Sequence, residues 1–178
     1  MKKILWLVCS LTAIAAVCAG VLAYVDSITK GPIAEMKVKQ AQAAAAAVMP
    51  AVGEVEKLKV EGLKGVAGAY VGTVDGKVVG YAVTGRDGKG YGGDIVLMVG
   101  FKADKKTVVS YKKLEANETP GLGAKLSSPE FADQFKGVDA SQPIKVAKSG
   151  GKIQAITSAT ITSKAVCRAV NDAQKKLK

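Results

Sequence analysis

The stretch Ile153-Gln-Ala-Ile-Thr-Ser-Ala-Thr-Ile-Thr-Ser-Lys-Ala-Val166 decides the fold of the C-terminal part, because its hydroxyl-rich loop runs directly into a helix. The apolar residues that follow have the spacing of one buried helical face: Val166, Ala169, Val170, Ala173 and Leu177. We expect Thr162 or Ser163 to be the N-cap of this helix. No Asp or Glu occupies its first turn, so the partial positive charge of the helix start is open to an outside anion such as a phosphate.

The N-terminus carries a long apolar run. Residues 4–25 contain no charge and are long enough to cross a hydrocarbon core at a rise of about 1.5 Å per residue. A cleaved signal peptide is the alternative, but its apolar core is usually about 7–15 residues long. We favour a retained span, with Lys2 and Lys3 in the cytoplasm and the following domain exported, because long domains translocate largely regardless of their charge.

A second helical segment follows the apolar run. Pro32 suits the first turn of a helix, the alanines at 43–47 have the highest helix propensity, and Pro50 ends the segment. We expect this helix to connect the membrane to a globular body, with a flexible alanine-rich tether as the alternative. The predicted divisions are a cytoplasmic tip at 1–3, a transmembrane anchor at 4–25, a connector helix at 26–50 and a single domain at 51–178.

The globular part alternates short strands with tight turns. Strands at 67–74 and 77–84 flank Asp75-Gly76, the two-residue signal of a type I′ hairpin, and 86–90 reads as a loop. Further strands are expected at 94–101 and 107–114, and a short helix at 128–135 with Ser127 or Ser128 as cap and two phenylalanines facing inward. The predicted fold class is α+β: a single N-terminal transmembrane helix, then one exported domain with an antiparallel sheet of at least four strands flanked by helices.

Composition excludes several kinds of chemistry. The chain has 178 residues with 26 Lys and Arg against 15 Asp and Glu, but the basic residues are scattered and aromatics are few, which argues against nucleic acid. It contains no His, which excludes a Ser-His-Asp triad and His-ligated zinc or haem. Cys9 and Cys18 lie in the apolar run, so Cys167 alone remains for the domain, as a buried structural thiol. We expect no metal site and no catalytic residue, and any electron carrier must be an organic cofactor.

Two glycine-rich loops are the other candidate sites. Gly90-Tyr-Gly-Gly-Asp94 precedes a strand, and its glycines permit close backbone approach or positive φ, although a simple turn is the alternative. It is not a Walker loop, because no Gly-Lys-Ser/Thr follows. In Glu118-Thr-Pro-Gly-Leu-Gly123 the glycines leave N–H groups uncovered, which suits a flat ring or the oxygen atoms of a ligand. It is not a dinucleotide fingerprint, because position 126 is Leu and no βαβ unit surrounds it.

Together these motifs resemble the FMN-binding domain found in the G subunit of the Rnf electron-transport complex. The segment 157–163 is similar to the family pattern S/T-G-A-T-x-[ST]-S, and the two loops are similar to G-Y-G-G/S-x-I and E-T-P-G-L-G. The C subunit of the sodium-pumping NADH:quinone oxidoreductase carries the first pattern too, but generally runs longer. The chain departs from the patterns at Ser158, where the family usually has Gly, at Gln154, where an acidic residue often stands, and at Asn117, which replaces a frequent His.

The resemblance implies FMN joined by a phosphoester to Thr160, in an electron-transfer subunit of an ion-translocating ferredoxin:NAD oxidoreductase. Such a chain is a redox subunit and not an independent catalyst. The other cofactor-binding residues that the resemblance implies are Thr157, Ser158, Ala159, Thr162, Glu118, Thr119, Gly121, Leu122, Gly123, Tyr91 and Gly92.

The implied partners are the other membrane and peripheral subunits of the Rnf complex, a flavin transferase during maturation, and the lipid bilayer. The soluble domain is expected on the extracytoplasmic (periplasmic) side of the cytoplasmic membrane. Two alternatives stay open from the sequence: a stand-alone extracytoplasmic FMN-binding electron-transfer protein, and a cofactor-free anchored binding or scaffold domain.

Overall fold

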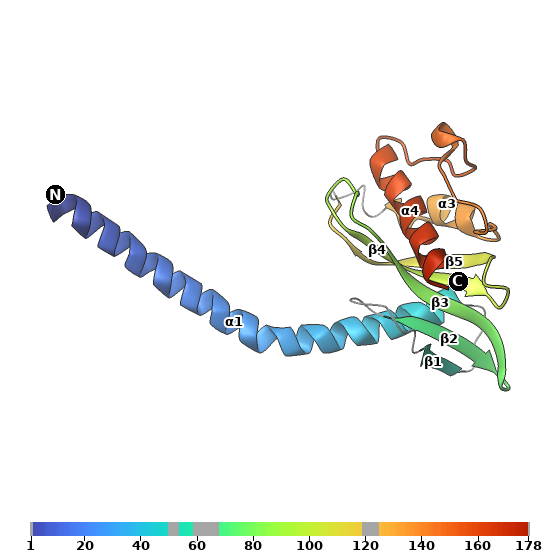
Figure 1. Ribbon diagram of the computed structural model, residues 1–178, viewed down its shortest axis with the longest axis horizontal. Helices are drawn as coiled ribbons and strands as arrows, with labels where there is room; N and C mark the ends of the chain where they lie inside the picture. Colours follow the sequence, from blue (N-terminus) through green and yellow to red (C-terminus); the bar gives the residue numbers. More distant parts are fainter. Residues whose placement is uncertain (1, 50–53, 59–67, 119–124, 178) are drawn as a thin grey trace. The chain divides into compact units, whose positions relative to one another are not determined.

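The computed structural model describes residues 2–49, 54–58, 68–118 and 125–177 (Figure 1). Contacts divide the chain into two compact units, Met1–Lys39 and Gln40–Lys178. Helix α1 (Lys2–Val48) is continuous and includes Pro32 in its interior, so the helix does not begin at that residue as predicted. Proline removes one hydrogen bond of the helical ladder, and here the apolar run before it and the alanines after it both continue the helix.

The domain is built on an antiparallel sheet with its strands in chain order. The strands are β1 (Glu54–Leu58), β2 (Ala69–Val74), β3 (Lys77–Asp87), β4 (Ile95–Lys102) and β5 (Val108–Ala116). The four predicted strands are all present, and β1 is a fifth that the sequence analysis missed. The predicted type I′ turn is confirmed, because Asp75 and Gly76 have φ values of 50° and 72°. Strand β3 continues past its predicted end at Thr84, because Gly85–Asp87 pair with the start of β4.

Among the described residues, the named helices after α1 are short except for the last. They are α3 (Pro129–Ala132), η1 (Asp133–Phe135), η2 (Ala147–Ser149) and α4 (Thr160–Leu177). Phe131 and Phe135 point inward as predicted, with ring centroids 5.5 Å apart. Ser128 is the N-cap of α3 by backbone geometry, but its hydroxyl donates to the Lys125 carbonyl instead of accepting a helix N–H.

The two faces of the sheet pack against different elements, since successive side chains of a strand point to opposite faces. Residues Leu97, Val99 and Phe101 of β4 belong to the larger cluster, with α4 and the α3–η1 segment. Met98, between them, belongs to a smaller cluster with the last turns of α1. The members of that smaller cluster are Ala41, Ala44, Ala45, Val48, Met49, Tyr70, Ala82 and Met98.

Each of the two long helices touches the sheet at a glycine. A Cβ added to Gly85 of β3 would lie 1.9 Å from the carbonyl oxygen of Ala169 in α4. A Cβ added to Gly100 of β4 would lie 1.9 Å from the carbonyl oxygen of Val48 in α1. At both positions only glycine allows the helix backbone to lie directly on the strand. The contact at Gly85 sets the distance of α4 from the sheet, and therefore the position of its first turn.

Candidate functional site

The first turn of α4 begins earlier than the sequence analysis predicted. The helix starts at Thr160, so neither Thr162 nor Ser163 is its N-cap. The Ser163 hydroxyl instead accepts the N–H of Ile156 at 2.9 Å and donates to the Ala159 carbonyl at 2.9 Å, which ties the preceding loop to the helix. As at any helix start, the N–H groups of residues 160–162 have no acceptor within the helix, and such groups can bind an anionic ligand.

The loop before α4 is bent at Ser158, whose φ of 63° lies in the left-handed region. An L-residue with a side chain is strained there by about 1–2 kcal/mol relative to the right-handed conformation, whereas glycine is not. This geometry explains why the similar motif has Gly at that position. Thr157 and Ser158 are exposed, Ala159 is buried, and Thr160 is half-buried at the helix start.

A pocket of about 480 Å³ surrounds Thr160. Three segments that are far apart in the chain line it: Tyr91 from the β3–β4 loop, Glu118 after β5, and residues 158–162. The structure therefore brings together residues predicted from all three motifs. It adds Ile161, which the sequence analysis missed and whose side chain is 53% exposed. An apolar residue off the buried stripe of an amphipathic helix is the signal that would have identified it.

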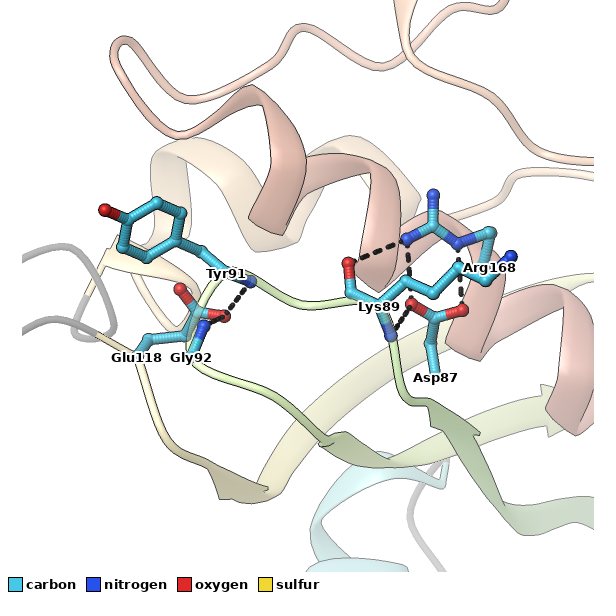
Figure 2. A network of polar contacts seen from close by, with 6 residues as sticks. All are labelled: Asp87, Lys89, Tyr91, Gly92, Glu118 and Arg168. Carbon is cyan, nitrogen blue, oxygen red and sulfur yellow. Dashed lines mark hydrogen bonds and ion pairs between the residues drawn. The ribbon is translucent and has the colours of Figure 1, made fainter.

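Glu118 connects these segments (Figure 2). Its Oε1 accepts the backbone N–H groups of Tyr91 at 3.0 Å and Gly92 at 3.4 Å, and its Oε2 accepts the hydroxyl of Thr162 at 2.8 Å. The α4 sequence has no acidic residue in its first turn. A carboxylate from elsewhere in the chain nevertheless reaches that turn, through a side-chain hydroxyl.

The glycines of the 90–94 loop allow the close approaches that the sequence analysis anticipated. A Cβ on Gly92 would lie 1.4 Å from the Asn117 carbonyl oxygen, and one on Gly90 would lie 2.4 Å from the Gly93 carbonyl oxygen. Gly93 has a φ of 113°. The loop thus lies directly on the residues that lead into Glu118, and a side chain at Gly92 would separate them.

A second polar connection holds the other end of the same loop. Arg168 of α4 donates through Nε and one terminal nitrogen to the two carboxylate oxygens of Asp87, both at 2.8 Å, and also donates to the Lys89 carbonyl at 3.1 Å (Figure 2). Burial raises the pKa of Asp87, but the Arg168 guanidinium and the Lys89 N–H together outweigh it, and the net pKa is lowered.

The sequence analysis also singled out residues of the second glycine-rich loop and, outside the site, one cysteine. Thr119, Gly121, Leu122 and Gly123 lie outside the described residues. Cys167 is buried as predicted, and burial raises the pKa of its thiol to about 12, so it is not a thiolate at neutral pH. Within the described ranges, no group of three or more His, Cys, Asp or Glu side chains is placed to hold a metal ion.

Comparison with known proteins first gives the class. Residues 90–175 match the family model of the FMN-binding domain, a range that contains the 90–94 loop, Glu118 and Thr160. Two solved structures share the fold. The C subunit of the Na(+)-translocating NADH-quinone reductase from Parabacteroides distasonis has a TM-score of 0.58 at 22% identity, covering 81% of this chain and 95% of that chain. NqrC of Shewanella oneidensis has a TM-score of 0.51 at 23% identity, covering 73% and 65%.

Relatives that are similar in sequence then give the family. The G subunit of the Na(+)-translocating ferredoxin:NAD(+) oxidoreductase complex of Acetobacterium woodii is 36% identical, covering 90% of this chain and 85% of the relative. The G subunit of the proton-translocating complex of Clostridium ljungdahlii is 40% identical, covering 86% and 80%. The chain belongs to this family, the G subunits of ion-translocating oxidoreductase (Rnf) complexes. The most apolar part of helix α1 is not buried against the rest of the protein. Together with its family, this apolar helix makes the chain a membrane-anchored protein of electron transport.

Proposed function

We propose that the chain carries FMN as a phosphoester on the Thr160 hydroxyl and transfers electrons within an ion-translocating ferredoxin:NAD oxidoreductase complex. The observation that supports this most directly is the position of Thr160. Its half-buried side chain lines a pocket at the first turn of α4, where helix N–H groups are available to a phosphate. Thr160 is then an acceptor for modification and takes no part in turnover.

The residues around Thr160 fit FMN in size and in polarity. A volume of about 480 Å³ falls within the range of roughly 300–1,000 Å³ typical of small-ligand sites. Tyr91 and Ile161 are exposed apolar side chains on the pocket wall, which suits contact with a flat aromatic ring. The Glu118 carboxylate already accepts three hydrogen bonds from the protein. Because these bonds stabilise its negative charge, the carboxylate is compatible with a neighbouring phosphate.

Bound FMN supplies reversible electron transfer that none of the side chains can perform. The protein's own part is to hold the group. Loss of a non-covalent cofactor outside the cytoplasm would be permanent, and even a ~1 nM site requires about 12 kcal/mol of binding free energy. A covalent bond to a threonine removes that requirement.

The same proposal covers the membrane arrangement. Residues 4–25 cross the cytoplasmic membrane, residues 1–3 lie in the cytoplasm, residues 26–50 connect, and the FMN-binding domain at 51–178 lies on the extracytoplasmic side. The apolar length of α1 and the two lysines before it support this orientation. The other subunits of the complex, a flavin transferase and the bilayer are the proposed partners.

Mass spectrometry of the intact chain tests the covalent linkage. When the chain is produced together with a flavin transferase, we expect a mass increment of one FMN less one water, and yellow fluorescence that persists after denaturation. Thr160→Ala removes both. Ser149→Ala is the matched control, because it removes an exposed hydroxyl outside this pocket and is expected to leave the label in place. A label that survives Thr160→Ala, or an unlabelled wild-type chain in a host that labels a known substrate, contradicts the proposal.

A further inference from the structure

We propose that Glu118 is a positioning residue, which holds the 90–94 loop on the first turn of α4 and thereby fixes the pocket around Thr160. This role concerns the pocket around Thr160, and of its two tests only flavin attachment rests on the proposed function. It assigns no contact between Glu118 and the cofactor. One carboxylate keeps three segments together before any cofactor is attached: the 90–94 loop, the end of the segment after β5, and the first turn of α4.

The hydrogen bonds of Glu118 are divided between two elements. One oxygen accepts the N–H groups of Tyr91 and Gly92, and the other accepts the Thr162 hydroxyl at 2.8 Å. Thr162 is buried and two residues beyond Thr160 in the same helical turn. A shift of the carboxylate therefore acts on the 90–94 loop and on the first turn of α4 together. These bonds are charge-assisted, so they are stronger than hydrogen bonds between neutral groups.

These bonds complete a closed ring that begins and ends on α4. Arg168 binds Asp87 and the Lys89 carbonyl just before the loop, and Glu118 binds the N–H groups of Tyr91 and Gly92 within it (Figure 2). The other carboxylate oxygen of Glu118 accepts the Thr162 hydroxyl and so returns to α4. The 90–94 loop contains Gly90, Gly92 and Gly93, and its last residue, Asp94, is paired with Arg86 of β3. Glycines have the largest conformational freedom to lose, so a loop that is rich in them requires attachment at both ends to keep one conformation.

The position of Tyr91 shows what this attachment does for the pocket. Tyr91 is 69% exposed, and its backbone N–H faces the Glu118 carboxylate (Figure 2). Because Tyr91 is so exposed, the backbone of the 90–94 loop sets its place on the pocket wall, and the bond from its N–H to Glu118 is one of the contacts that hold this backbone. Without that bond, the wall opposite residues 158–162 is no longer defined.

Hydrogen exchange of the unmodified full-length chain, in detergent, tests the inference without any cofactor. Glu118→Ala is expected to speed exchange of the Tyr91 and Gly92 amides about tenfold, the effect of losing one hydrogen bond. Glu118→Gln keeps an acceptor oxygen and a donor for Thr162, so it is expected to stay within about threefold of wild type. Thr162→Val is expected to resemble Glu118→Ala, and Thr162→Ser, which keeps the hydroxyl, to resemble wild type.

The double variant Glu118→Ala with Thr162→Val separates a shared role from two independent ones. If both residues act through the same contact, the double variant exchanges no faster at residues 91 and 92 than Glu118→Ala alone. Additive acceleration contradicts the inference. Glu130→Ala is the matched control: it removes an exposed carboxylate outside this pocket, and unchanged exchange at 91 and 92 is expected.

Flavin attachment is the second readout. With a transferase present, Glu118→Ala and Thr162→Val are expected to lower the labelled fraction at a fixed reaction time at least about threefold, with Glu118→Gln and Thr162→Ser restoring it. Unchanged exchange in Glu118→Ala overturns the positioning role. An unlabelled wild-type chain instead contradicts the proposed function, and the exchange experiment still decides the role of Glu118.

Discussion

The two faces of the sheet are built from different side chains. The face toward α1 is packed mainly by alanines of the helix against Tyr70, Ala82 and Met98. The face toward α4 contains Phe101, Phe131 and Phe135, with Tyr111 in edge-to-face contact with Phe135 at 5.2 Å. Both helices lie on a glycine of the sheet, and the first turn of α4 lines a pocket. The comparison shows that close helix–sheet contact is a structural device common to both faces, whereas the site requires the loops that meet at the start of α4.

Alanine at the two glycine contacts is expected to have the largest effect. Gly85→Ala and Gly100→Ala each place a Cβ within 1.9 Å of a helix carbonyl oxygen, and each is expected to lower the free energy of unfolding by about 3 kcal/mol. Urea unfolding of the full chain in detergent measures this.

The two variants are controls for each other. Because Gly85 supports α4, Gly85→Ala is expected to reduce flavin attachment at a temperature where both variants remain folded, while Gly100→Ala keeps it. Equal loss of attachment in both would show that the two faces are not separable.

The ion pair between Asp87 and Arg168 joins β3 to α4, so its removal tests how much charge contributes to the packing of α4 on the sheet. Asp87→Asn is expected to cost about 1.5 kcal/mol near neutral pH, between the values of exposed and buried pairs. The control is Asp133→Asn, whose pair with Lys136 is more than half exposed and is expected to be worth less than about 0.5 kcal/mol.

The Asp87 effect is expected to depend on pH. The folded-state pKa of Asp87 lies below its ordinary value, so its stabilisation is present above the unfolded pKa of about 3.9 and is lost as pH falls through the folded pKa. The stability difference between wild type and Asp87→Asn is therefore constant from about pH 5 upward and disappears in stronger acid. A difference that persists below the folded pKa means that the charge does not cause it.

The smallest expected effect is at Ser158, and it is stabilising. Its φ of 63° favours glycine, so Ser158→Gly is expected to raise the free energy of unfolding by about 0.5–1 kcal/mol. Ser128→Gly is the control, because Ser128 has a φ of −67° and its hydroxyl donates to Lys125. That substitution is expected to destabilise, and thermal unfolding measures both.

The fold was predicted best where short-range patterns dominate. Asp75-Gly76 indicated a hairpin, and the apolar spacing after Val166 indicated the buried face of α4. Strand β1 was missed because its sequence, Glu54-Val-Glu-Lys-Leu58, is charged and short, so its strand character depends on pairing with β2. The start of α4 was misplaced because Thr162 and Ser163 are typical cap residues, yet both hydroxyls bond to other segments.

The candidate site was partly predictable for the same reason. Motif resemblance identified Thr160, Glu118 and Tyr91, which the structure places around one pocket. The Asp87–Arg168 pair joins residues 81 positions apart, and the bond from Glu118 to Thr162 joins residues 44 positions apart. No local pattern encodes such pairings, because they arise only when α4 packs beside the end of β3 and beside the segment that follows β5.

The last turns of α1 have a consequence for any attempt to detach the domain from the bilayer. Ala41, Ala44, Ala45 and Val48 are almost completely buried, so the helix that begins at Lys2 ends as part of the hydrophobic interior. A protease that cleaves just after Val48 would strip the cover from Tyr70 and Met98 and release a fragment prone to aggregate. Shedding that yields a soluble, folded fragment has to occur upstream of Ala41.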